Sequence, residues 1–580
     1  MSNSDFSKIF SEISRILELR GTNNFKVSAY RNAGREIEHM AEDLEDIYKE
    51  KGVNGLVNLT GIGESIAEKI EELIKTGKCK YYENLKKKIP KVELEMLNVP
   101  GIGAKTARKL YKELNLRSLS DLEEKAKAGK VRELEGFRAR TEENILQSLK
   151  SLRERKKITR YLLTFAEPIA QDVLKYLKKC KDVKKCDVVG SLRRMKETVG
   201  DIDLIVGSSN PEKVIEHFVK YPNKKKVILK GDTKGAILHK EIVQIDLEVL
   251  PMKNYGSLLQ HFTGSKEHNV HLRTWAKKEG YSISEYGVIK GKARTHKLFS
   301  DEQDFYKYFG MQNIPPELRE DRGEIEAALE DKLPKFVDFK DIKGDLHMHS
   351  ESSDARSSLE ELIAEARKLG YEYIAISEHA EGLGITQGLS GRGLLKQHEK
   401  IQSLNKKSKS FRVLSSVEAN IMADGKLDIS DDVLSKLDIV TVSVHSSFRQ
   451  SEAKMTKRLI TAIRNPNVDV IGHPSGRLLL QRDPYEVDWL KIFKEASKNK
   501  VALEINAHPE RLDLRDDLIK SALKFGVKFA VNTDAHSVDG LHLMKYGVAT
   551  ARRGWAEASD VINTFSLEDL FKWLENVRNA

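Results

Sequence analysis

Seven short strand-like segments fill the chain from Gly344 to its end, and each is followed by a helical or loop stretch of ordinary length. Such regular alternation restricts this half to a parallel α/β architecture. Seven units predict a TIM-like (β/α)7 barrel over residues 344–580. The candidate strands read DLHMH, YIAISEH, VLSSVEA, DIVTVSVH, VDVIGH, VALEIN and KFAVNTDAH.

Histidines and carboxylates collect at the C-terminal ends of these segments. His347 and His349 stand at positions i and i+2, on one face of a strand, and Asp534-Ala-His536 repeats that spacing. The C-terminal strand ends of a β/α barrel converge on one rim, so we predict one cavity lined by metal ligands. The predicted ligands are His347, His349, Asp354, His379, Glu418, His445, His473, Asp534 and His536.

Nine ligands exceed the need of one ion and suit two or three. Imidazole with carboxylate favours Zn²⁺, Mn²⁺ or Fe²⁺, and clustered metals activate water and neutralise phosphate during hydrolysis. A single histidine at a strand end is more often a core or rim residue, but ligands in register on six strands are hard to obtain by chance. His398, His508 and His542 fall outside the pattern and stay unassigned.

Three carboxylates lie on two strand-like segments in the middle of the chain. Asp201 and Asp203 share one face of VGDIDLIVG, and Asp246 lies in VQIDLEVL. A lone Asp-x-Asp pair is usually a surface pair, but the apolar flanks place these acids on buried strands, where they need a metal or a partner. Three such carboxylates can hold two Mg²⁺ ions, one for an attacking hydroxyl and one for a triphosphate.

A glycine turn precedes this acidic strand. Gly190-Ser191 opens the basic segment LRRMK, which contains Arg194. Backbone N–H groups in such a turn can meet phosphate oxygens, and the guanidinium can pair with them.

The N-terminal 150 residues read as helices with short turns, and one pattern occurs twice: LTGIGESIAEKI at 59–70 and VPGIGAKTARKL at 99–110. Glycines let the backbone approach a DNA phosphate, and the free N–H groups of the following helix bind it. This helix-hairpin-helix pattern predicts a grip on the DNA backbone without base reading. Its residues are Gly61, Gly63, Gly101, Gly103 and Lys105. A third copy at 134–145 is degenerate.

Charge and composition narrow the function classes. Residues 51–300 hold 52 lysines and arginines against 32 aspartates and glutamates. This excess suggests a polyanion partner, nucleic acid first, but charge alone fits a solvated lysine-rich surface equally well. No apolar run approaches the ~18 residues of a membrane span, and the N-terminus lacks a secretory signal. Three cysteines without a Cys-x-x-Cys pair fit a reducing cytoplasm.

The C-terminal half resembles the PHP (polymerase and histidinol phosphatase) domain, on the motifs DLHMHSESSD, SEH, SVEAN, SVHS, GHPSGR and NTDAH. The resemblance covers about 344–580 and implies a trinuclear phosphoesterase site made of the nine ligands above. Glu378 departs from the usual Asp before the histidine, and we expect it to lie behind the ligands and orient His379.

The first 320 residues resemble the family X DNA polymerases, of the DNA polymerase beta type, through YGSLLQHFTGSKEHNVHLR and GYSISEYGV. The resemblance implies that Asp201, Asp203 and Asp246 are the catalytic, metal-binding triad. It further implies triphosphate contacts from Gly190, Ser191, Arg194 and Gly200, a sugar pocket at Phe262 and Gly264, a base contact at Asn269 and a template contact at Arg273. His261 replaces a common Tyr, so sugar discrimination stays open.

NNFKVSAYRNAG together with GIGESIAEKIEEL resembles the small 5′-deoxyribose-phosphate lyase domain of the same polymerases. Lys69 aligns with the Schiff-base lysine there, although binding of a 5′-phosphate at a gap is the stronger expectation. The resemblance as a whole implies six parts: a lyase-like helical domain (1–82), a second helical DNA-binding subdomain (83–150), a nucleotidyltransferase α+β palm (151–252), a thumb (253–318), an ordered connector (319–343) and the PHP barrel (344–580).

These features predict a monomeric, prokaryotic-type polymerase that fills short gaps during base excision repair. It would use gapped or primed duplex DNA and deoxynucleoside triphosphates, with Mg²⁺ or Mn²⁺ at the triad. Two to three Mn²⁺ or Zn²⁺ ions in the PHP domain would support 3′→5′ exonuclease, 3′-end processing or abasic-site cleavage. The alternatives are a structural PHP domain, a small-molecule phosphatase, and a non-catalytic gap-binding protein, which the intact triad disfavours.

Overall fold

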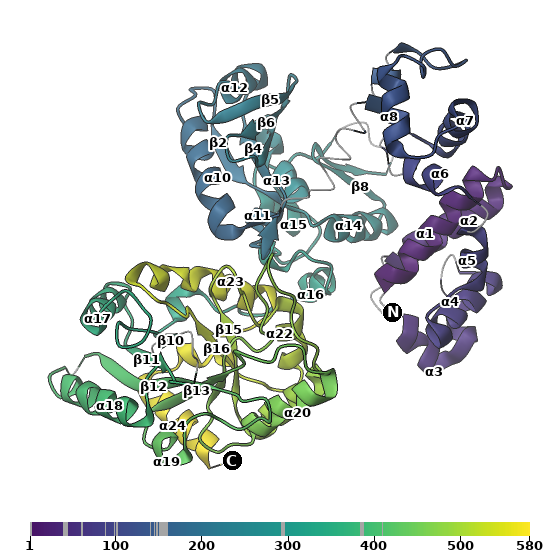
Figure 1. Cartoon of the computed structure of the whole chain (residues 1–580). Helices are drawn as coiled ribbons and strands as arrows, with labels where there is room; N and C mark the ends of the chain where they lie inside the picture. The colour runs from purple at the N-terminus through teal and green to yellow at the C-terminus, as the bar shows by residue number, and fades with distance from the viewer. Residues whose placement is uncertain are drawn as a thin grey trace. The chain divides into compact units, whose positions relative to one another are not determined.

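A computed structural model gives the fold of the chain (Figure 1). It describes residues 3–38, 44–57, 59, 62–86, 89–97, 99, 102–139, 141–143, 145–146, 149, 160–291, 296–382, 388–408 and 410–579. The chain forms two compact units, Met1–Thr159 and Arg160–Ala580.

The first unit is helical, as the sequence predicts. Its helices are amphipathic: Phe6, Phe10, Ile13 and Leu17 recur at helical spacing along α1 and are buried. Two apolar clusters form, one among the first five helices and one around α6–α8. The helices are α1 (Asn3–Leu19), α2 (Asn24–Glu38), α3 (Leu44–Val57), α4 (Glu64–Thr76), α5 (Lys80–Lys86), α6 (Lys91–Met96), α7 (Ala104–Leu114) and α8 (Leu119–Lys127).

The second unit begins with the palm, a five-stranded sheet in the order β2-β4-β7-β6-β5. β4 and β7 pair in parallel and the other neighbours pair antiparallel. The helices α10 (Leu163–Leu177) and α12 (Pro211–Phe218) contribute buried apolar side chains to the palm core. The strands are β2 (Lys185–Val188), β4 (Ile202–Gly207), β5 (Lys224–Lys230), β6 (Lys234–His239) and β7 (Gln244–Leu250), and Tyr161–Leu162 (β1) pairs with Thr198–Val199 (β3) outside the sheet.

The thumb follows, with helices packed beside a small hairpin. Its elements are α13 (Tyr255–Thr263), α14 (Lys266–Lys278), β8 (Tyr281–Ser284), β9 (Gly287–Lys290) and α15 (Glu302–Tyr308). The expected connector is ordered. Arg319 is fully buried and pairs with Glu302 at 2.6 Å, and α16 (Glu324–Leu329) packs into the thumb core.

Seven parallel strands form the barrel, in the chain order β10 to β16. All seven predicted strands are present, and a parallel bridge between Met348 and Ala535 joins the first strand to the segment after the last. The strands are β10 (Gly344–Met348), β11 (Tyr373–His379), β12 (Arg412–Asn420), β13 (Ile439–Ser443), β14 (Val470–Ile471), β15 (Ala502–Asn506) and β16 (Phe529–Asn532).

Helices surround the barrel strands (Figure 1). They are α17 (Leu359–Lys368), α18 (Gly391–Asn405), α19 (Asp431–Leu434), α20 (Glu452–Ile463), α21 (Trp489–Lys498), α22 (Asp516–Leu523), α23 (Met544–Arg553) and α24 (Leu567–Arg578). Among the residues that the structure describes, none of the helices is both long and apolar enough to span a bilayer.

Candidate functional site

The nine predicted PHP ligands come together at the C-terminal ends of the barrel strands. Glu418, at the end of β12, is the central carboxylate. Its oxygens lie 2.9 Å from His379 Nδ1, 3.0 Å from His473 Nε2 and 3.2 Å from His445 Nε2. His347 Nε2 lies 3.6 Å from the same carboxylate. Four imidazoles that follow or lie on different strands therefore share Glu418 as an anionic partner.

Eight of the nine predicted ligands form three overlapping groups. Within each group, every residue has a ligand atom that lies within 4.8 Å of those of the other members. His349 and His379 each belong to two groups, so the three groups form one continuous cluster. His473 joins the cluster through its contact with Glu418. The groups are His349, Asp354, His379 and His536; His347, His349 and Asp534; and His379, Glu418 and His445.

The electrostatics of this cluster fit metal cations. Burial alone would raise the pKa of Glu418, but His445, His347 and His379 hold it well below its usual range. Burial and the neighbouring imidazoles lower the pKa of His349 to about 4. His347 Nε2 and His349 Nε2 face each other at 3.2 Å. Both nitrogens would serve as ligands to a cation bound beside them.

Unpartnered atoms support the same assignment. Nδ1 of His349 and Nδ1 of His473 are buried and have no hydrogen-bond partner among the residues that the structure describes. Buried polar atoms are normally satisfied, so each such nitrogen needs a ligand or another explanation. The donor set of imidazole and carboxylate suits divalent transition-metal ions.

One supporting residue was not predicted from the sequence. Glu504, in the middle of β15, accepts a hydrogen bond from His347 Nδ1 at 2.7 Å and one from the His473 main-chain N–H at 2.7 Å. This contact fixes the His347 ring with Nε2 turned towards Glu418 and Asp534. The signal was present in VALEIN, because an acid inside an apolar strand needs a partner.

The expectation for Glu378 is wrong in its detail. Glu378 does not orient His379, whose Nδ1 lies 2.9 Å from Glu418. It accepts hydrogen bonds from the Ser350 and Ser353 hydroxyls and from Gln397 Nε2 at 2.8 Å. Because those serines precede Asp354, Glu378 holds the first barrel loop instead.

None of the three unassigned histidines belongs to a ligand group among the described residues. Of the three, the His508 ring is close enough to Asp534 and His536 for their charges to act on its pKa. His398 Nδ1 lies 2.7 Å from Ser415 Oγ, and His542 Nε2 lies 3.2 Å from Glu365. The main-chain N–H of His508 donates to Asn506 Oδ1, and burial lowers the pKa of the His508 ring.

The palm sheet brings the three aspartates together. Asp203 on β4 is paired directly with Asp246 on β7, and Asp201 lies just before β4. Oxygens of all three lie within 4.8 Å of one another. Burial, Asp201 and Asp246 raise the pKa of Asp203 to about 7. Such mutual repulsion is relieved by a divalent cation, so the triad fits the ions predicted for it.

Position 190 requires glycine, because its backbone lies against Asp203 of this triad. It begins the short helix α11 (Gly190–Arg193) with a φ of +63°. A Cβ there would lie 2.1 Å from Asp203 Oδ2. The Gly-Ser turn therefore lies against the acidic cluster, with Ser191 in the first turn of α11.

The predicted triphosphate and sugar residues also converge. Arg194 Nη1 donates to the Thr263 carbonyl at 2.5 Å, and its Nε donates to Glu320 at 3.0 Å. A Cβ on Gly264, whose φ is +69°, would lie 3.0 Å from Arg194 Nη1. Gly200 directly precedes Asp201 and has open space around its Cα, with Arg160 Nη1 3.9 Å from an added Cβ.

The predicted base-facing and template residues are linked through His261. Asn269 Nδ2 donates to the His261 carbonyl at 2.7 Å, and Arg273 Nη2 lies 2.8 Å from His261 Nδ1. Burial lowers the pKa of His261. Phe262 is half-buried, with Lys234 Nζ 5.9 Å from its ring centroid.

Both described helix-hairpin-helix turns end at a glycine N-cap. Gly63 precedes α4 and Gly103 precedes α7, each with extended backbone and no capping side chain. Such helix N-termini can bind anions. Lys105 is exposed on the first turn of α7. Gly61 and Gly101 lie outside the described residues.

Lys69 lies on α4, with Nζ 2.7 Å from the Ser65 carbonyl and 5.0 Å from the Tyr81 ring centroid. Burial lowers the pKa of this amine.

Family models match four stretches of the chain. They are a helix-hairpin-helix domain at 1–79, a SAM-like helix-hairpin-helix tandem at 93–151, the DNA polymerase beta thumb at 258–320 and the PHP domain at 345–508. The PHP match ends before the last strand, β16, which completes the described barrel and precedes Asp534 and His536.

Known proteins match either the whole chain or the barrel. Two proteins named "Probable phosphatase", from Thermoanaerobacter sp. (strain X514) and Caldicellulosiruptor bescii, are 34% and 32% identical over 203 and 205 residues. These matches cover 33% and 34% of this chain and 78% and 80% of the relatives. The DNA polymerase/3′-5′ exonuclease PolX of Bacillus subtilis (strain 168) is 39% identical over 577 residues, 99% of this chain and all of that protein. On this full-length similarity, the chain belongs to the family X DNA polymerases that carry a C-terminal PHP domain.

Proposed function

We propose that this chain fills short gaps in duplex DNA during base excision repair and trims 3′ ends with its PHP domain. The observation that carries the proposal is the presence of two separate ligand sets in one chain. An aspartate triad lies beside a Gly-Ser turn on the palm sheet, and a His-rich cluster lies at the barrel rim. Each set has the chemistry of a metal-dependent phosphoryl-transfer site. We place the domain limits at 1–82, 83–150, 151–252, 253–318, 319–343 and 344–580.

In the polymerase site, Asp201, Asp203 and Asp246 would hold Mg²⁺ or Mn²⁺. When bound, such ions lower the pKa of a primer 3′-hydroxyl and stabilise the leaving pyrophosphate. Gln244 orients Asp246 by donating to both of its oxygens, at 3.0 and 2.9 Å. The Gly190-Ser191 turn offers main-chain N–H groups to the triphosphate.

Around the bound nucleotide, Arg194 supplies a fixed positive charge beside the triphosphate. Phe262 and Gly264 border the sugar. Asn269 meets the base and Arg273 the template strand. Asn269 and Arg273 are both held by His261, so this residue governs how the pocket meets the sugar and the base pair.

In the PHP site, the nine ligands would hold two to three Mn²⁺ or Zn²⁺ ions, which supply a nucleophilic hydroxide at neutral pH. Glu504 fixes His347 for this task, and Glu378 fixes the loop that carries Asp354. Arg511 Nε lies 3.5 Å from Asp534 and presents a guanidinium at the rim. One site of this kind can serve 3′→5′ exonuclease, 3′-end processing and abasic-site cleavage, because each breaks a phosphate ester at or near a 3′ end.

The test follows a 5′-labelled primer in a one-nucleotide-gap duplex with Mn²⁺, with and without deoxynucleotides. We expect longer product with nucleotides and shorter product without them. Asp246→Ala should abolish extension and spare trimming, and His347→Ala should do the reverse. Loss of both activities in Asp246→Ala would contradict the two-site model, and trimming that survives His347→Ala would leave the PHP domain structural.

The similarity to the two proteins named "Probable phosphatase" favours one alternative for the barrel, a small-molecule phosphatase. Turnover of histidinol phosphate, compared with that of a 3′-phosphorylated oligonucleotide, separates the two substrate classes. We expect the oligonucleotide to be preferred.

A second candidate activity in the first unit is 5′-deoxyribose-phosphate lyase, favoured by the lowered pKa of Lys69. A neutral amine can attack an abasic-site aldehyde, after which the 3′ phosphate leaves by β-elimination. Borohydride should trap the wild type on abasic DNA but not Lys69→Ala, which should still extend a plain primer. Absence of a trapped wild-type adduct would dismiss the lyase.

A further inference from the structure

The palm loop 194–197 joins the Gly-Ser turn to the aspartate triad. It begins at Arg194, passes through Met195 with a φ of 51°, and ends at Glu197, four residues before Asp201. Its position therefore sets where Arg194 lies relative to the triad. The barrel, far away in sequence, supplies contacts at both ends of this loop.

Arg553, the last residue of α23, holds the first end. Its Nη1 donates to the Arg194 carbonyl at 2.7 Å and to Glu320 Oε1 at 3.1 Å. Its Nη2 donates to Asp516 Oδ2 at 2.6 Å. The side chain is buried, so removing it would leave two buried carboxylates with fewer partners.

Glu320 connects Arg553 to the guanidinium of Arg194. One carboxylate oxygen accepts from Arg194 Nε at 3.0 Å, and the other lies 3.5 Å from Lys196 Nζ. Burial would raise the pKa of Glu320, but Arg553, Arg194 and Lys196 lower it to about 2. This carboxylate is therefore a fixed anion between the barrel arginine and the loop.

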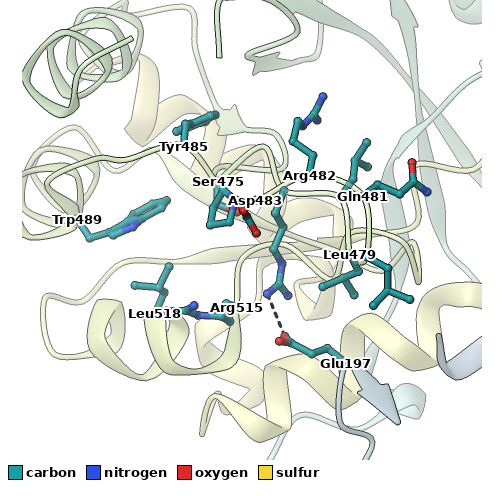
Figure 2. Close-up of a pocket in the computed structure, with 14 residues that line it drawn as sticks. Glu197, Ser475, Leu479, Gln481, Arg482, Asp483, Tyr485, Trp489, Arg515 and Leu518 are labelled. Carbon is teal, nitrogen blue, oxygen red and sulfur yellow. Dashed lines mark ion pairs between the residues drawn. The ribbon is translucent and has the colours of Figure 1, made fainter. Parts of the chain in front are cut away.

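Arg477 holds the other end of the loop. Its Nη1 pairs with Glu197 Oε2 at 2.9 Å, the dashed contact that ends at Glu197 in Figure 2. Its Nε donates to the Arg511 carbonyl at 2.8 Å, so the guanidinium is anchored on barrel backbone. Arg477 follows the candidate ligand His473 by four residues.

We infer that Arg553 and Arg477 are positioning residues for the polymerase site, which fix the palm loop 194–197 and thereby the guanidinium of Arg194. The inference rests on the proposed role of Arg194 in binding the triphosphate. A guanidinium held before the substrate arrives loses less freedom on binding it. The barrel thus serves nucleotide binding in addition to its own chemistry.

Other ion pairs between the barrel and the polymerase part provide matched controls. Lys545 pairs with Glu167 on α10 at 2.8 Å, and Arg552 pairs with Glu317 at 2.9 Å. Neither barrel residue has a recorded contact with the loop among the described residues. Arg552 is the chain neighbour of Arg553 on the same helix, so it controls for general loosening of α23.

The test measures KM for the incoming deoxynucleotide and kcat for gap filling, with PHP trimming as the folding control. Arg553→Ala and Glu197→Gln should each raise KM about 10-fold, the scale of coupling through such networks, with a smaller change in kcat. Arg552→Ala and Lys545→Ala should leave KM unchanged, and Arg553→Lys should restore part of the loss. If Arg553→Ala does not fold, Glu197→Gln still tests the loop from the palm side.

The results distinguish the positioning role of Arg553 and Arg477 from the proposed role of Arg194 in binding the triphosphate. If Arg194→Ala raises KM while Arg553→Ala and Glu197→Gln do not, the positioning role is wrong and the proposed nucleotide site stands. If Arg194→Ala leaves KM unchanged, the proposed role of Arg194 fails, and the inference fails with it. Equal effects in Arg552→Ala and Arg553→Ala would show a general interface effect and overturn the assignment to the loop.

Discussion

At the scale of single residues, Gly190 tightly constrains the proposed polymerase site. Its positive φ and the 2.1 Å separation of an added Cβ from Asp203 Oδ2 exclude any side chain. Gly190→Ala should therefore displace Asp203 and lower gap filling by about 10²-fold, the scale of a 1 Å misplacement. A primer-extension assay measures this effect, and unchanged 3′-end trimming serves as the control. Wild-type extension by this variant would contradict the close packing.

A second residue-scale prediction concerns pH. The folded pKa of Asp203 is raised from 3.8 to about 7, so between these values the folded state holds a proton that the unfolded state has lost. The contribution of this group to the stability of the metal-free chain therefore falls as pH rises through that window.

Divalent cations should reverse that loss, because they bind the ionised triad. The Mg²⁺ concentration for half-maximal extension should fall about tenfold per pH unit as pH rises towards 7, and level off above it. Extension measured over Mg²⁺ series at pH 6, 7 and 8 tests this. A Mg²⁺ requirement independent of pH would contradict a raised Asp203 pKa.

At the scale of secondary-structure elements, Glu378 links β11 to the loop that carries Asp354. All three recorded side-chain partners of Glu378 are donors: Ser350, Ser353 and Gln397. Glu378→Gln would turn an amide N–H₂ towards them, so we expect trimming to fall about 10- to 100-fold, as for other residues that support metal ligands. Glu381→Gln, an exposed change just after the same strand, is the control. Equal trimming in both variants would remove this role from Glu378.

Strands could be predicted from the sequence where their side chains are regularly buried, and not where the strand is exposed. The barrel strands are buried apart from Arg412 at the start of β12, so their apolar segments, with the predicted ligands near the ends, stand out in the sequence. β5 was missed because KKKVILK lies at an exposed sheet edge, where lysines replace the buried pattern. Glu504 lies inside its strand, whereas the predicted ligands lie at or just after strand ends, so the pattern that predicts the ligands does not include it.

At the scale of the whole molecule, the sequence predicts two separate metal-ligand sets, but it does not predict the contacts between the barrel and the palm. Asp203 and Asp246 fall on paired strands with Asp201 just before them, and short motifs carry most of the predicted PHP ligands. The grouping of each residue set could therefore be predicted from the sequence. Glu320 and Arg553 lie 233 residues apart, and each stands beside other charged residues, in ELREDR and in ARR. No local pattern distinguishes such a pair from surface charges, so only the folded structure reveals it.

DNA binding by the whole molecule should be strongly dependent on salt. The basic excess of residues 51–300 and the two glycine-capped helix N-termini predict contacts with backbone phosphates, which release counterions on binding. With six or more such contacts, affinity for a one-nucleotide-gap duplex should fall about 10³-fold between 50 and 200 mM salt. Lys105→Ala should reduce the slope of log K against log salt by about 1, as the loss of one phosphate contact does.

Fluorescence anisotropy with labelled gapped DNA measures the slope of log K against log salt for the wild type and for Lys105→Ala. Lys572→Ala, on the last helix of the barrel, is the matched control, because Lys572 already pairs with Glu568 at 2.6 Å and should not alter the slope. A flat salt response of the wild type would remove the electrostatic basis for DNA binding. An unchanged slope in Lys105→Ala alone would instead move the contact away from α7, because the remaining basic residues would still account for the salt dependence.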